Sequence, residues 1–472
     1  MPFRLMVDAA RACYAARILR SPAIEPTPRF GWRARLFGIT VMAALYATEH
    51  RALARTEDGV HRPRVSHRAR AHQPDAPPPP PATPPDDPPA TPPPEDPRTN
   101  VHLVPSGTIA LPGRGLSVAW SPDGTRLAVG GHFRDKETRL RYDTRVADVA
   151  ARALVKSFAC HWFWAVSQAW VDHPDYGPLL ADGGGDHAVK VWDPDARGSS
   201  TCHPGQFLAA DGALQQLGEI NGWITSLAFS PDRRWLAGAS RDRTVRIWRL
   251  HPGPNAWRVV ALWLDQEVGN FLSVDWSPDG RAVVTGDRRG RVAVWAVDPE
   301  RDRWDDATIA QFARFSYEDQ ASWCGSHSTL TSRVPRWSES GHGVIWNARW
   351  APDGHRVAAA GTDGTVSVYD AVSGEVLLRQ TMPDPGSLHG LAWHPDSRWL
   401  AAGGSDERIY VYDTAGNVLY DTLEGHDDVV TALAWSPDGE TLASTAGGPL
   451  LKEALIDVSD GPDQTVRLWR WR

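Results

Sequence analysis

Trp435-Ser-Pro-Asp-Gly439 lies between two apolar runs, and close variants of this phrase recur along the chain. Ser-Pro-Asp-Gly suits a type I turn, because proline presets φ at the second position and glycine tolerates the conformation at the exit. A turn that recurs between apolar runs indicates one supersecondary unit copied many times. The other copies lie at Trp120–Gly124, Phe229–Arg233, Trp276–Gly280, Trp350–Gly354 and Trp393–Ser397, with a degraded one at Trp170–Pro174.

A second regular pattern follows each turn. The unit continues with a strand that resembles Leu-Ala-x-Gly, a short polar turn that holds Asp, and a β-branched strand that ends in Trp or Tyr. Alternation of apolar and polar residues, as in Thr244-Val-Arg-Ile-Trp248, predicts strands with one buried face. Seven such last strands are predicted, at Arg139–Asp143, Ala188–Asp193, Thr244–Trp248, Arg291–Trp295, Thr365–Asp370, Arg408–Asp413 and Thr465–Trp469.

The repeated unit resembles that of the WD-repeat β-propeller family, whose repeat is about 40–45 residues long. The last two copies keep that spacing, and the resemblance covers about four-fifths of the chain. The literal Trp-Asp ending is present only at Trp192-Asp193, and Tyr-Asp or Trp-Arg replaces it elsewhere. The resemblance implies an all-β fold, a seven-bladed propeller over residues 100–472.

The resemblance also implies how the ring would close. In this family an N-terminal strand completes the last blade, and here the chain stops at Arg472, directly after the strand that ends in Leu468-Trp469, which leaves the seventh blade one strand short. We expect Thr108–Leu111, within the upstream segment Val101–Leu111, to supply that outer strand. Pairing the first and last segments would remove an exposed strand edge.

The composition fits a large β-protein without a disulfide scaffold. The 472 residues include 42% hydrophobic residues, 23 Trp and 4 Cys. The net charge is −7, and because residues 1–72 carry about thirteen Arg and five acidic groups, the remainder stands at about −15. An acidic propeller is poorly suited to a phosphate backbone, so we expect no nucleic-acid partner.

The composition of residues 1–99 predicts a disordered extension that is basic and rich in proline. Residues 73–99 indicate an extended linker, which we interpret as a spacer because no basic anchor lies among its prolines. Residues 1–72 indicate a basic arm, disordered or partly helical. Within that arm, residues 36–47 are apolar but too short for an ordinary transmembrane helix.

The apolar segment 36–47 leaves several interpretations open. It fits the hydrophobic region of a signal peptide or a membrane anchor, and a start site upstream of the true one is a further interpretation. We expect a cytoplasmic protein, with export or membrane tethering through this segment as the alternative. Membrane contact follows only if the segment is an anchor.

The family resemblance further implies a hydrogen-bonded tetrad of His, Ser or Thr, Asp and Trp that ties the strands of a blade together. Such a network fixes a unique packing, because buried polar groups must find partners. The last repeat matches the tetrad at His426, Ser444, Asp463 and Trp469. Other repeats keep only parts of it, at Asp242, Asp287, Asp363, Asp406 and the pair Gly341-His342. We interpret these residues as structural rather than as a catalytic pair.

No catalytic motif stands out. The sequence contains no Gly-x-Ser-x-Gly, P-loop, His-Glu-x-x-His or Cys-x-x-Cys, so we expect no enzyme and no cofactor. Two dipeptides, Cys160-His161 and Cys202-His203, offer four ligands of the kind that zinc binds. Their ligands are adjacent rather than two apart, so we interpret them as ordinary buried or loop residues and expect no metal. A Cys160–Cys202 disulfide is reasonable only for an exported chain.

The rims of the predicted propeller are candidate binding surfaces. The resemblance implies that partners bind the face where the inner strands begin, and we expect the positions that flank the first apolar residue of each strand to point outward there. Two interpretations stay open: the tryptophans are interface anchors, a role that Trp and Arg often have, or they pack on neighbouring blades. The positions are Arg114, Trp164, Trp223, Asn270, Trp346, His389 and Thr431, with Arg241 on the same face.

Two insertions break the period of the repeat, and loops this long are usually functional or disordered. Residues 298–344 contain Asp305–Phe315, which has helical spacing with Ile309, Phe312 and Phe315 at i, i+3 and i+6. Residues 447–460 carry Leu450, Leu451, Leu455 and Ile456. Either insertion is a docking element or covers an apolar rim, and the first is the better functional candidate because its stripe must be buried.

These observations predict a non-catalytic scaffold, a monomeric propeller that presents one face to a protein or peptide partner. A propeller enzyme, a hydrolase or lyase with a site in the central channel, is the rival class. Against it, the inner strands carry Ser, Ala, Leu and Val rather than converging His, Asp or metal ligands. An envelope sensor tethered through residues 36–47 is the third possibility. We expect specific recognition where the repeat is interrupted, near Trp162–Trp164 and in the first insertion.

Overall fold

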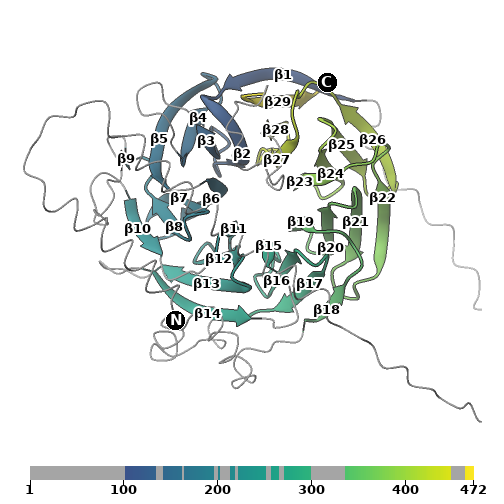
Figure 1. The fold of residues 1–472 in the computed structure, drawn as a ribbon, viewed down its shortest axis with the longest axis horizontal. Coiled ribbons are helices and arrows are strands. Elements are labelled where there is room, and N and C mark those ends of the chain that lie inside the picture. Colours follow the sequence, from purple (N-terminus) through teal and green to yellow (C-terminus); the bar gives the residue numbers. More distant parts are fainter. Residues whose placement is uncertain are drawn as a thin grey trace, which may run out of the picture. The chain divides into compact units, whose positions relative to one another are not determined.

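The repeats fold into seven sheets arranged as blades around a central axis (Figure 1). The computed structural model describes residues 101–133, 142–161, 164–195, 200–201, 213–217, 222–250, 257–264, 270–298, 335–447 and 463–472. Every regular element among these residues is a strand. The predicted all-β fold and the seven-bladed propeller are confirmed.

The chain divides into two compact units, Met1–Pro92 and Pro93–Arg472, and the propeller belongs to the second. The predictions for the basic arm 1–72, its apolar segment 36–47 and the linker 73–99 lie outside the described residues. In the part of the chain that the structure describes, no helix is long and apolar enough to span a membrane.

Each blade is built from four antiparallel strands, which follow one another from the central axis to the outside of the ring. Blade 1 has a fifth strand. Blades 1 to 3 consist of β2 (Gly113–Trp120), β3 (Arg126–Phe133), β4 (Tyr142–Asp148), β5 (Ala153–His161) and β9 (Ser200–Thr201); β6 (Ala165–His173), β7 (Gly177–Gly184), β8 (Val189–Trp192) and β10 (Ala213–Leu217); and β11 (Ile224–Phe229), β12 (Trp235–Ser240), β13 (Thr244–Leu250) and β14 (Trp257–Leu264).

Blades 4 to 7 repeat the plan, and blade 7 takes its outer strand from the beginning of the propeller. They consist of β15 (Phe271–Trp276), β16 (Ala282–Asp287), β17 (Val292–Ala296) and β18 (Trp337–Glu339); β19 (Ile345–Trp350), β20 (Arg356–Gly361), β21 (Thr365–Asp370) and β22 (Val376–Thr381); β23 (Leu388–Trp393), β24 (Trp399–Gly404), β25 (Ile409–Asp413) and β26 (Val418–Leu423); and β27 (Val430–Trp435), β28 (Thr441–Ala446), β29 (Thr465–Trp471) and β1 (Leu103–Ala110).

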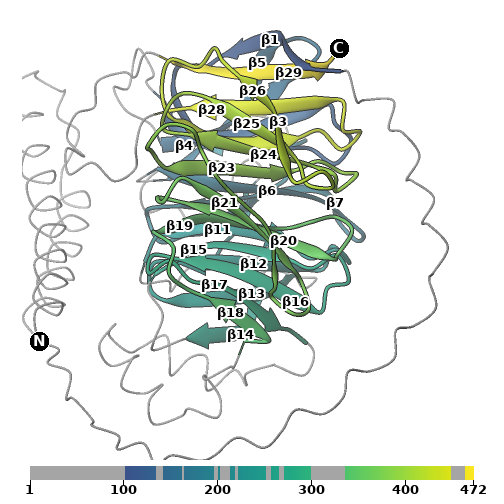
Figure 2. The same cartoon turned by 90° about the vertical axis from the view of Figure 1, so that its right-hand side faces the viewer.

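The strands cross the thickness of the ring between two rims (Figure 2). We call the rim where the inner strands begin the front rim; the turns between the second and third strands of each blade lie there too. The opposite rim, with the Ser-Pro-Asp-Gly turns between the first and second strands, is the back rim.

The recurring turn owes its conformation to local hydrogen bonds. In the last copy Gly439 N donates to the main-chain oxygen of Ser436 (2.9 Å), which closes the turn. The Ser436 hydroxyl donates to Asp438 Oδ1 (2.5 Å) and accepts from Thr441 N (2.9 Å), so one side chain joins the turn to the next strand. Gly439 has a φ of 73°, a left-handed conformation that glycine adopts at little cost. The turn is therefore a structural device at the back rim.

The ring is closed by pairing of β1 with β29. Their register runs from Leu103 opposite Trp471 to Ala110 opposite Thr465. Ile109 is fully buried in this pairing. The prediction of an N-terminal outer strand is confirmed, and the observed strand is longer than the expected Thr108–Leu111 because it begins at Leu103.

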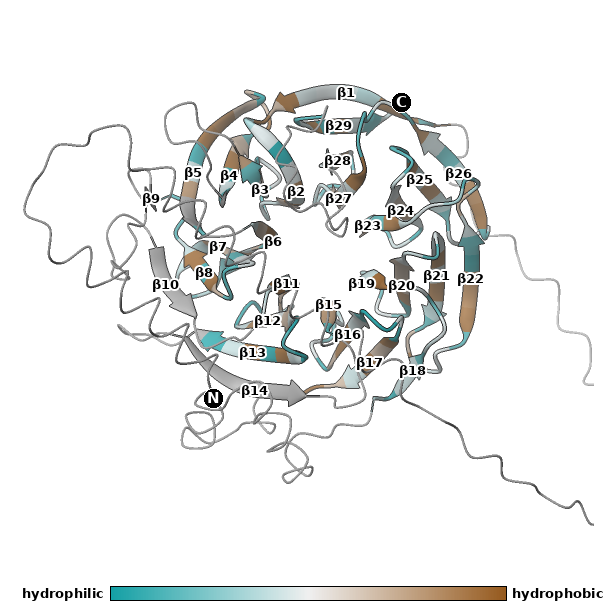
Figure 3. Cartoon of the chain, viewed as in Figure 1, coloured by the Kyte–Doolittle hydropathy of each residue, from teal (hydrophilic) through white to brown (hydrophobic). Residues whose placement is uncertain are grey.

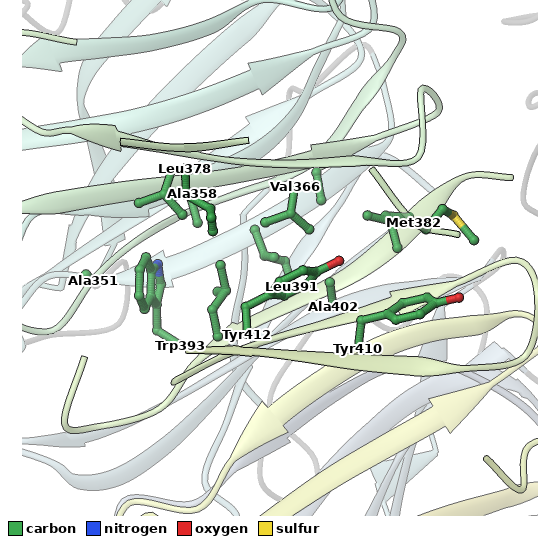
Figure 4. Packing of buried hydrophobic residues seen from close by; sticks show 14 residues of the cluster. Ala351, Ala358, Val366, Leu378, Met382, Leu391, Trp393, Ala402, Tyr410 and Tyr412 are labelled. Atoms are coloured by element: carbon green, nitrogen blue, oxygen red, sulfur yellow. The ribbon is translucent and has the colours of Figure 1, made fainter. Parts of the chain in front are cut away.

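The hydrophobic core lies between the blades rather than within a single centre. The described residues form seven clusters of buried side chains, and each cluster joins two neighbouring blades. Between blades 5 and 6, Leu378 and Val366 lie on one side and Leu391 and Tyr412 on the other (Figure 4). Each blade therefore depends on both neighbours for the burial of its faces.

Two expectations about element positions need correction. The third strand of blade 1 was expected at Arg139–Asp143 but runs over Tyr142–Asp148, because eight residues separate it from β3, whereas three or four separate the corresponding strands of blades 2 to 6. The stretch 298–344 is not wholly an insertion, since it contains β18, a strand of only three residues. The expected helix Asp305–Phe315 and nearly all of residues 447–460 lie outside the described residues.

Candidate functional site

Every inner strand carries a β-bulge at the front rim. In β19, for instance, Ile345 pairs with Gly361 and Asn347 pairs with Ala360, so the intervening Trp346 is unpaired. The same irregularity recurs at the start of β2, β6, β11, β15, β23 and β27. A bulge re-aims the side chain of its extra residue. The front rim therefore presents a ring of residues whose directions differ from those of the regular strand.

The predicted rim residues occupy two positions of this bulge. Trp346, His389 and Thr431 are the unpaired bulge residues of β19, β23 and β27. The remaining four directly precede the residue at which the bulge begins: Arg114, Trp164, Trp223 and Asn270.

Two tryptophans and one arginine meet on the front rim of blades 2 and 3. The rings of Trp164 and Trp223 pack edge to face, with centroids 5.8 Å apart and an interplanar angle of 75°. The guanidinium carbon of Arg241 lies 4.1 Å from the centroid of the Trp223 ring. Arg241 N also donates to the main-chain oxygen of Trp223 (3.0 Å), which holds the two residues in register. All three residues are half-buried. We call this group the tryptophan cluster.

A second aromatic pair lies on blades 5 and 6. The rings of Trp346 and His389 have centroids 5.3 Å apart. His389 is buried and its Nε2 lies 2.8 Å from the hydroxyl of Ser387. Burial lowers the pKa of His389 to about 4, so its ring is neutral at physiological pH. Trp346 remains half-buried, and among the described residues its Nε1 has no hydrogen-bond partner.

Two of the expected outward positions pack inward instead. His389 and Thr431 are each only 9% exposed. The Thr431 hydroxyl donates to the main-chain oxygen of Gly115 (3.0 Å), which ties blade 7 to blade 1. Arg114 and Asn270 are half-buried on blades 1 and 4. The front rim thus combines residues that join blades with residues that keep exposed surface, and the tryptophan cluster belongs to the second kind.

The four residues of the expected tetrad lie in hydrogen-bond contact in blade 7. His426 Nδ1 lies 2.6 Å from Asp463 Oδ2, and His426 Nε2 lies 2.7 Å from Ser444 Oγ. Trp469 Nε1 donates to the same hydroxyl (2.8 Å). Burial acts to raise the pKa of Asp463, but hydrogen bonds from His426 and Thr465 outweigh it and hold that pKa well below its usual range. The network joins the segment before β27 to β28 and β29.

Blade 2 contains a charged version of this tetrad, which the sequence reasoning missed. Asp182 of β7 lies opposite Lys190 of β8 in the strand register, as Ser444 of β28 lies opposite Arg467 of β29. Asp182 therefore occupies the position of the serine. His161 Nδ1 lies 2.8 Å from Asp186 Oδ1 and its Nε2 lies 3.2 Å from Asp182 Oδ1.

Electrostatics hold this charged cluster together. Burial and Lys190 act to lower the pKa of His161, but Asp182 and Asp186 outweigh them and raise it. Lys190 Nζ lies 3.0 Å from Asp186 Oδ2, so a cation also stands beside the carboxylates. The spacing in the sequence could have predicted this cluster. His161 lies four residues before Ala165, where β6 begins, as His426 lies four residues before Val430, where β27 begins.

Blades 4 and 5 each keep part of the network. In blade 4, Trp295 Nε1 donates to Thr285 Oγ1 (2.8 Å), as Trp469 does to Ser444. In blade 5, His342 Nδ1 lies 3.2 Å from Asp363 Oδ2, and Tyr369 Oη lies 2.9 Å from His342 Nε2. The tyrosine hydroxyl thus reaches the histidine without a serine between them. These contacts support a structural role for the His and Asp residues of the repeats.

The described residues give only partial information on the two Cys-His dipeptides. His161 belongs to the charged cluster of blade 2. The side chain of Cys160 and all of Cys202 and His203 lie outside the described residues, so neither the zinc nor the disulfide hypothesis is tested. Within the described ranges, no group of three or more His, Cys, Asp or Glu residues could hold a metal ion.

Seven blades of at least four strands each, closed by the first strand and tied by His–Asp networks, define a seven-bladed repeat propeller. The family model described as WD domain, G-beta repeat matches residues 214–249, 266–296, 333–370, 378–413 and 417–470. The chain belongs to the WD-repeat family.

Three relatives show the same likeness over part of their length. The chain is 32% identical over 127 residues to an uncharacterized WD repeat-containing protein, sll1491, of Synechocystis sp., which is 27% of this chain and 32% of that protein. It is 29% identical over 140 residues to Protein HIR1 of Cryptococcus neoformans, which is 28% of this chain and 15% of that protein. It is 34% identical over 103 residues to the protein transport protein SEC13 of Chaetomium globosum, which is 20% of this chain and 30% of that protein. The matches span about a third or less of these relatives.

Proposed function

We propose that the protein is a non-catalytic scaffold that binds a protein or peptide segment on the front rim of blades 2 and 3. The observation that carries the proposal is the tryptophan cluster. Its members Trp164, Trp223 and Arg241 already contact one another and keep part of their surface exposed. Trp and Arg are enriched among residues that dominate interface energetics. A prepacked cluster loses little side-chain entropy on binding, which favours affinity.

Membership of the WD-repeat family supports this function at the level of its class. The names of these three relatives describe no enzyme, and one of them is a protein transport protein. Fold likeness indicates the class of function but not the partner. We place the protein in the cytoplasm as a monomeric propeller, with the basic arm and the proline-rich linker as its tether or spacer.

Trp346 extends the proposed surface to blade 5. It is half-buried on the same rim, and among the described residues its indole Nε1 has no hydrogen-bond partner. Because Nε1 itself is buried, a bound segment would contact the exposed part of the ring. Arg114 on blade 1 is the further candidate contact on this rim.

Affinity capture with purified full-length protein tests the proposal. The wild type is compared with a Trp164→Ala/Trp223→Ala/Trp346→Ala variant and with the control Tyr176→Ala, which removes an aromatic side chain that is 39% exposed at the back rim. We expect the triple variant to lose at least tenfold of the captured partner and the control to keep it. Circular dichroism and thermal unfolding establish that each variant is folded. Identical partner lists for a folded triple variant and the wild type would refute the proposed surface.

A further inference from the structure

An exposed apolar surface follows the outer strands of blades 5 and 6 at the back rim. Seven large hydrophobic side chains are exposed among the described residues, and five of them lie in β22, in β26 and in the turn before β22. We call these five the apolar stripe: Val372 (82% exposed), Val376 (38%), Leu377 (42%), Val418 (49%) and Leu419 (39%). Single exposed hydrophobic residues are ordinary, whereas a gathered set marks a docking surface.

Hydrogen bonds join the outer strands that carry and border the apolar stripe. Gln380 of β22 donates from Nε2 to the main-chain oxygen of Asn417 (3.5 Å), directly before β26. Figure 3 shows hydrophobic segments of both strands on the outside of the ring. At the other end, Trp337 of β18 donates from Nε1 to the main-chain oxygen of Ala371 (2.9 Å), next to Val372. The stripe therefore lies on β22, β26 and the turn before β22, and β18 borders it through Trp337.

The connection from β17 to β18 returns to the blades at the end of this stripe. Residues 299–334 of the connection lie outside the described residues. Arg336 holds its return point, because its main-chain N donates to Val294 O (2.7 Å) and its guanidinium to Arg281 O (3.3 Å). Trp337, whose indole donates to Ala371 next to Val372 of the apolar stripe, follows directly. The connection and the exposed surface are thus neighbours on the same rim.

The sequence of the connection supplies matching apolar side chains. Ile309, Phe312 and Phe315 are spaced at i, i+3 and i+6, so a helix would place them on one face. The six residues 299–304 reach about 20 Å when extended, and the nineteen residues 316–334 reach about 60 Å. β22 and β26 lie in the next two blades after β18. The connection is long enough to place these side chains over the stripe.

We propose that residues 305–315 dock on the apolar stripe of the same chain through Ile309, Phe312 and Phe315. Docking would remove apolar surface from water on both sides, which is the driving force that this contact needs. The proposal is independent of the scaffold function, because it concerns the back rim of blades 5 and 6 rather than the front rim. It gives the insertion an intramolecular role, a cover for blades whose outer strands expose leucine and valine.

Hydrogen–deuterium exchange of the full-length chain tests the proposal. We expect peptides that cover residues 305–315 to exchange at least tenfold more slowly in the wild type than in a synthetic peptide of the same sequence. The protection should be lost in Leu377→Ser/Leu419→Ser. It should persist in the control Val155→Ser, which changes a valine that is 58% exposed on β5 of blade 1. Wild-type exchange at the rate of the free peptide, or protection that survives the stripe variant, would overturn the proposal.

A second variant and a measurement of molecular mass distinguish docking of residues 305–315 from binding of a second copy of the chain to the stripe. Phe312→Ser/Phe315→Ser leaves the described blades unchanged and should raise the exchange of peptides from the starts of β22 and β26 severalfold. Unchanged exchange there would count against docking. Light scattering of the wild type and of the stripe variant reports the oligomeric state. A wild-type dimer that becomes a monomer in the stripe variant would assign the surface to a second copy and overturn the intramolecular proposal.

Discussion

Removing β1 should open the ring, and the burial of its side chains gives the size of the effect. Leu103, Ile109 and the adjacent Leu111 are 4%, 0% and 6% exposed. Full burial of such a side chain contributes about 1.5–3 kcal/mol, so the three together contribute about 5–9 kcal/mol. The native state as a whole is stable by only about 5–15 kcal/mol. Loss of β1 should therefore remove most of the stability and expose the edge of β29.

Urea unfolding followed by tryptophan fluorescence measures this effect. Three chains are compared: the full-length protein, a chain that begins at residue 100 and keeps β1, and a chain that begins at residue 113 and lacks it. We expect the first two to unfold within about 0.5 kcal/mol of each other, since the removed residues precede the propeller. The third chain should be largely unfolded without urea or should unfold at a much lower concentration.

A point substitution separates the role of the strand from the effect of truncation. Ile109→Ala should cost about 2–5 kcal/mol, the usual range for a fully buried isoleucine. The control Val155→Ala, at a position 58% exposed on another outer strand, should cost less than about 0.5 kcal/mol. Equal unfolding midpoints for the chains that begin at residues 100 and 113 would refute the reasoning, because the ring would then not need its first strand.

The tetrad and the front rim give two further predictions. Ser444→Ala removes the hydroxyl that Trp469 Nε1 and His426 contact and should lower the free energy of unfolding by about 1–3 kcal/mol. Ser444→Thr keeps the hydroxyl and should lower it less. Equal losses of stability in urea unfolding would contradict the network. Because burial lowers the folded-state pKa of His389 to about 4 while an unfolded histidine titrates near about 6.5, the unfolded chain binds the extra proton first. Stability should therefore fall by up to about 3 kcal/mol as the pH drops from 6.5 to 4. His389→Gln should flatten this part of the unfolding profile, and an unchanged slope would show that His389 is not its source.

The fold could be predicted from the sequence because its signals are local and repeated. Each Ser-Pro-Asp-Gly turn specifies its own conformation through hydrogen bonds such as that from Gly439 N to Ser436 O. The tetrad of blade 7 was visible for the same reason, since each of its residue types stands at the family spacing. Even the closing strand followed from the repeat count.

The remaining features depend on contacts that spacing alone does not show. Blade 2 replaces the serine of the tetrad with Asp182, and this carboxylate is tolerated because His161 and Lys190 lie beside it. Blade 5 lacks the serine, and the hydroxyl of Tyr369 reaches His342 instead. His389 is buried at the unpaired position of a bulge, which shifts the pairing by one residue and leaves no mark in the composition of the strand.

The pairing of β1 with β29 also has a consequence for the order of folding. Ile109 lies opposite Val466, so the strand that is made first finds its partner only when synthesis reaches the last blade. At about 5–20 residues per second, the 357 positions between them correspond to roughly 20–70 s. During that interval β1 has no partner edge, and six blades can already pack on one another in sequence. The ring can therefore become circular only as the last step of folding, and the nascent chain must be kept from pairing its free edges with other molecules until then.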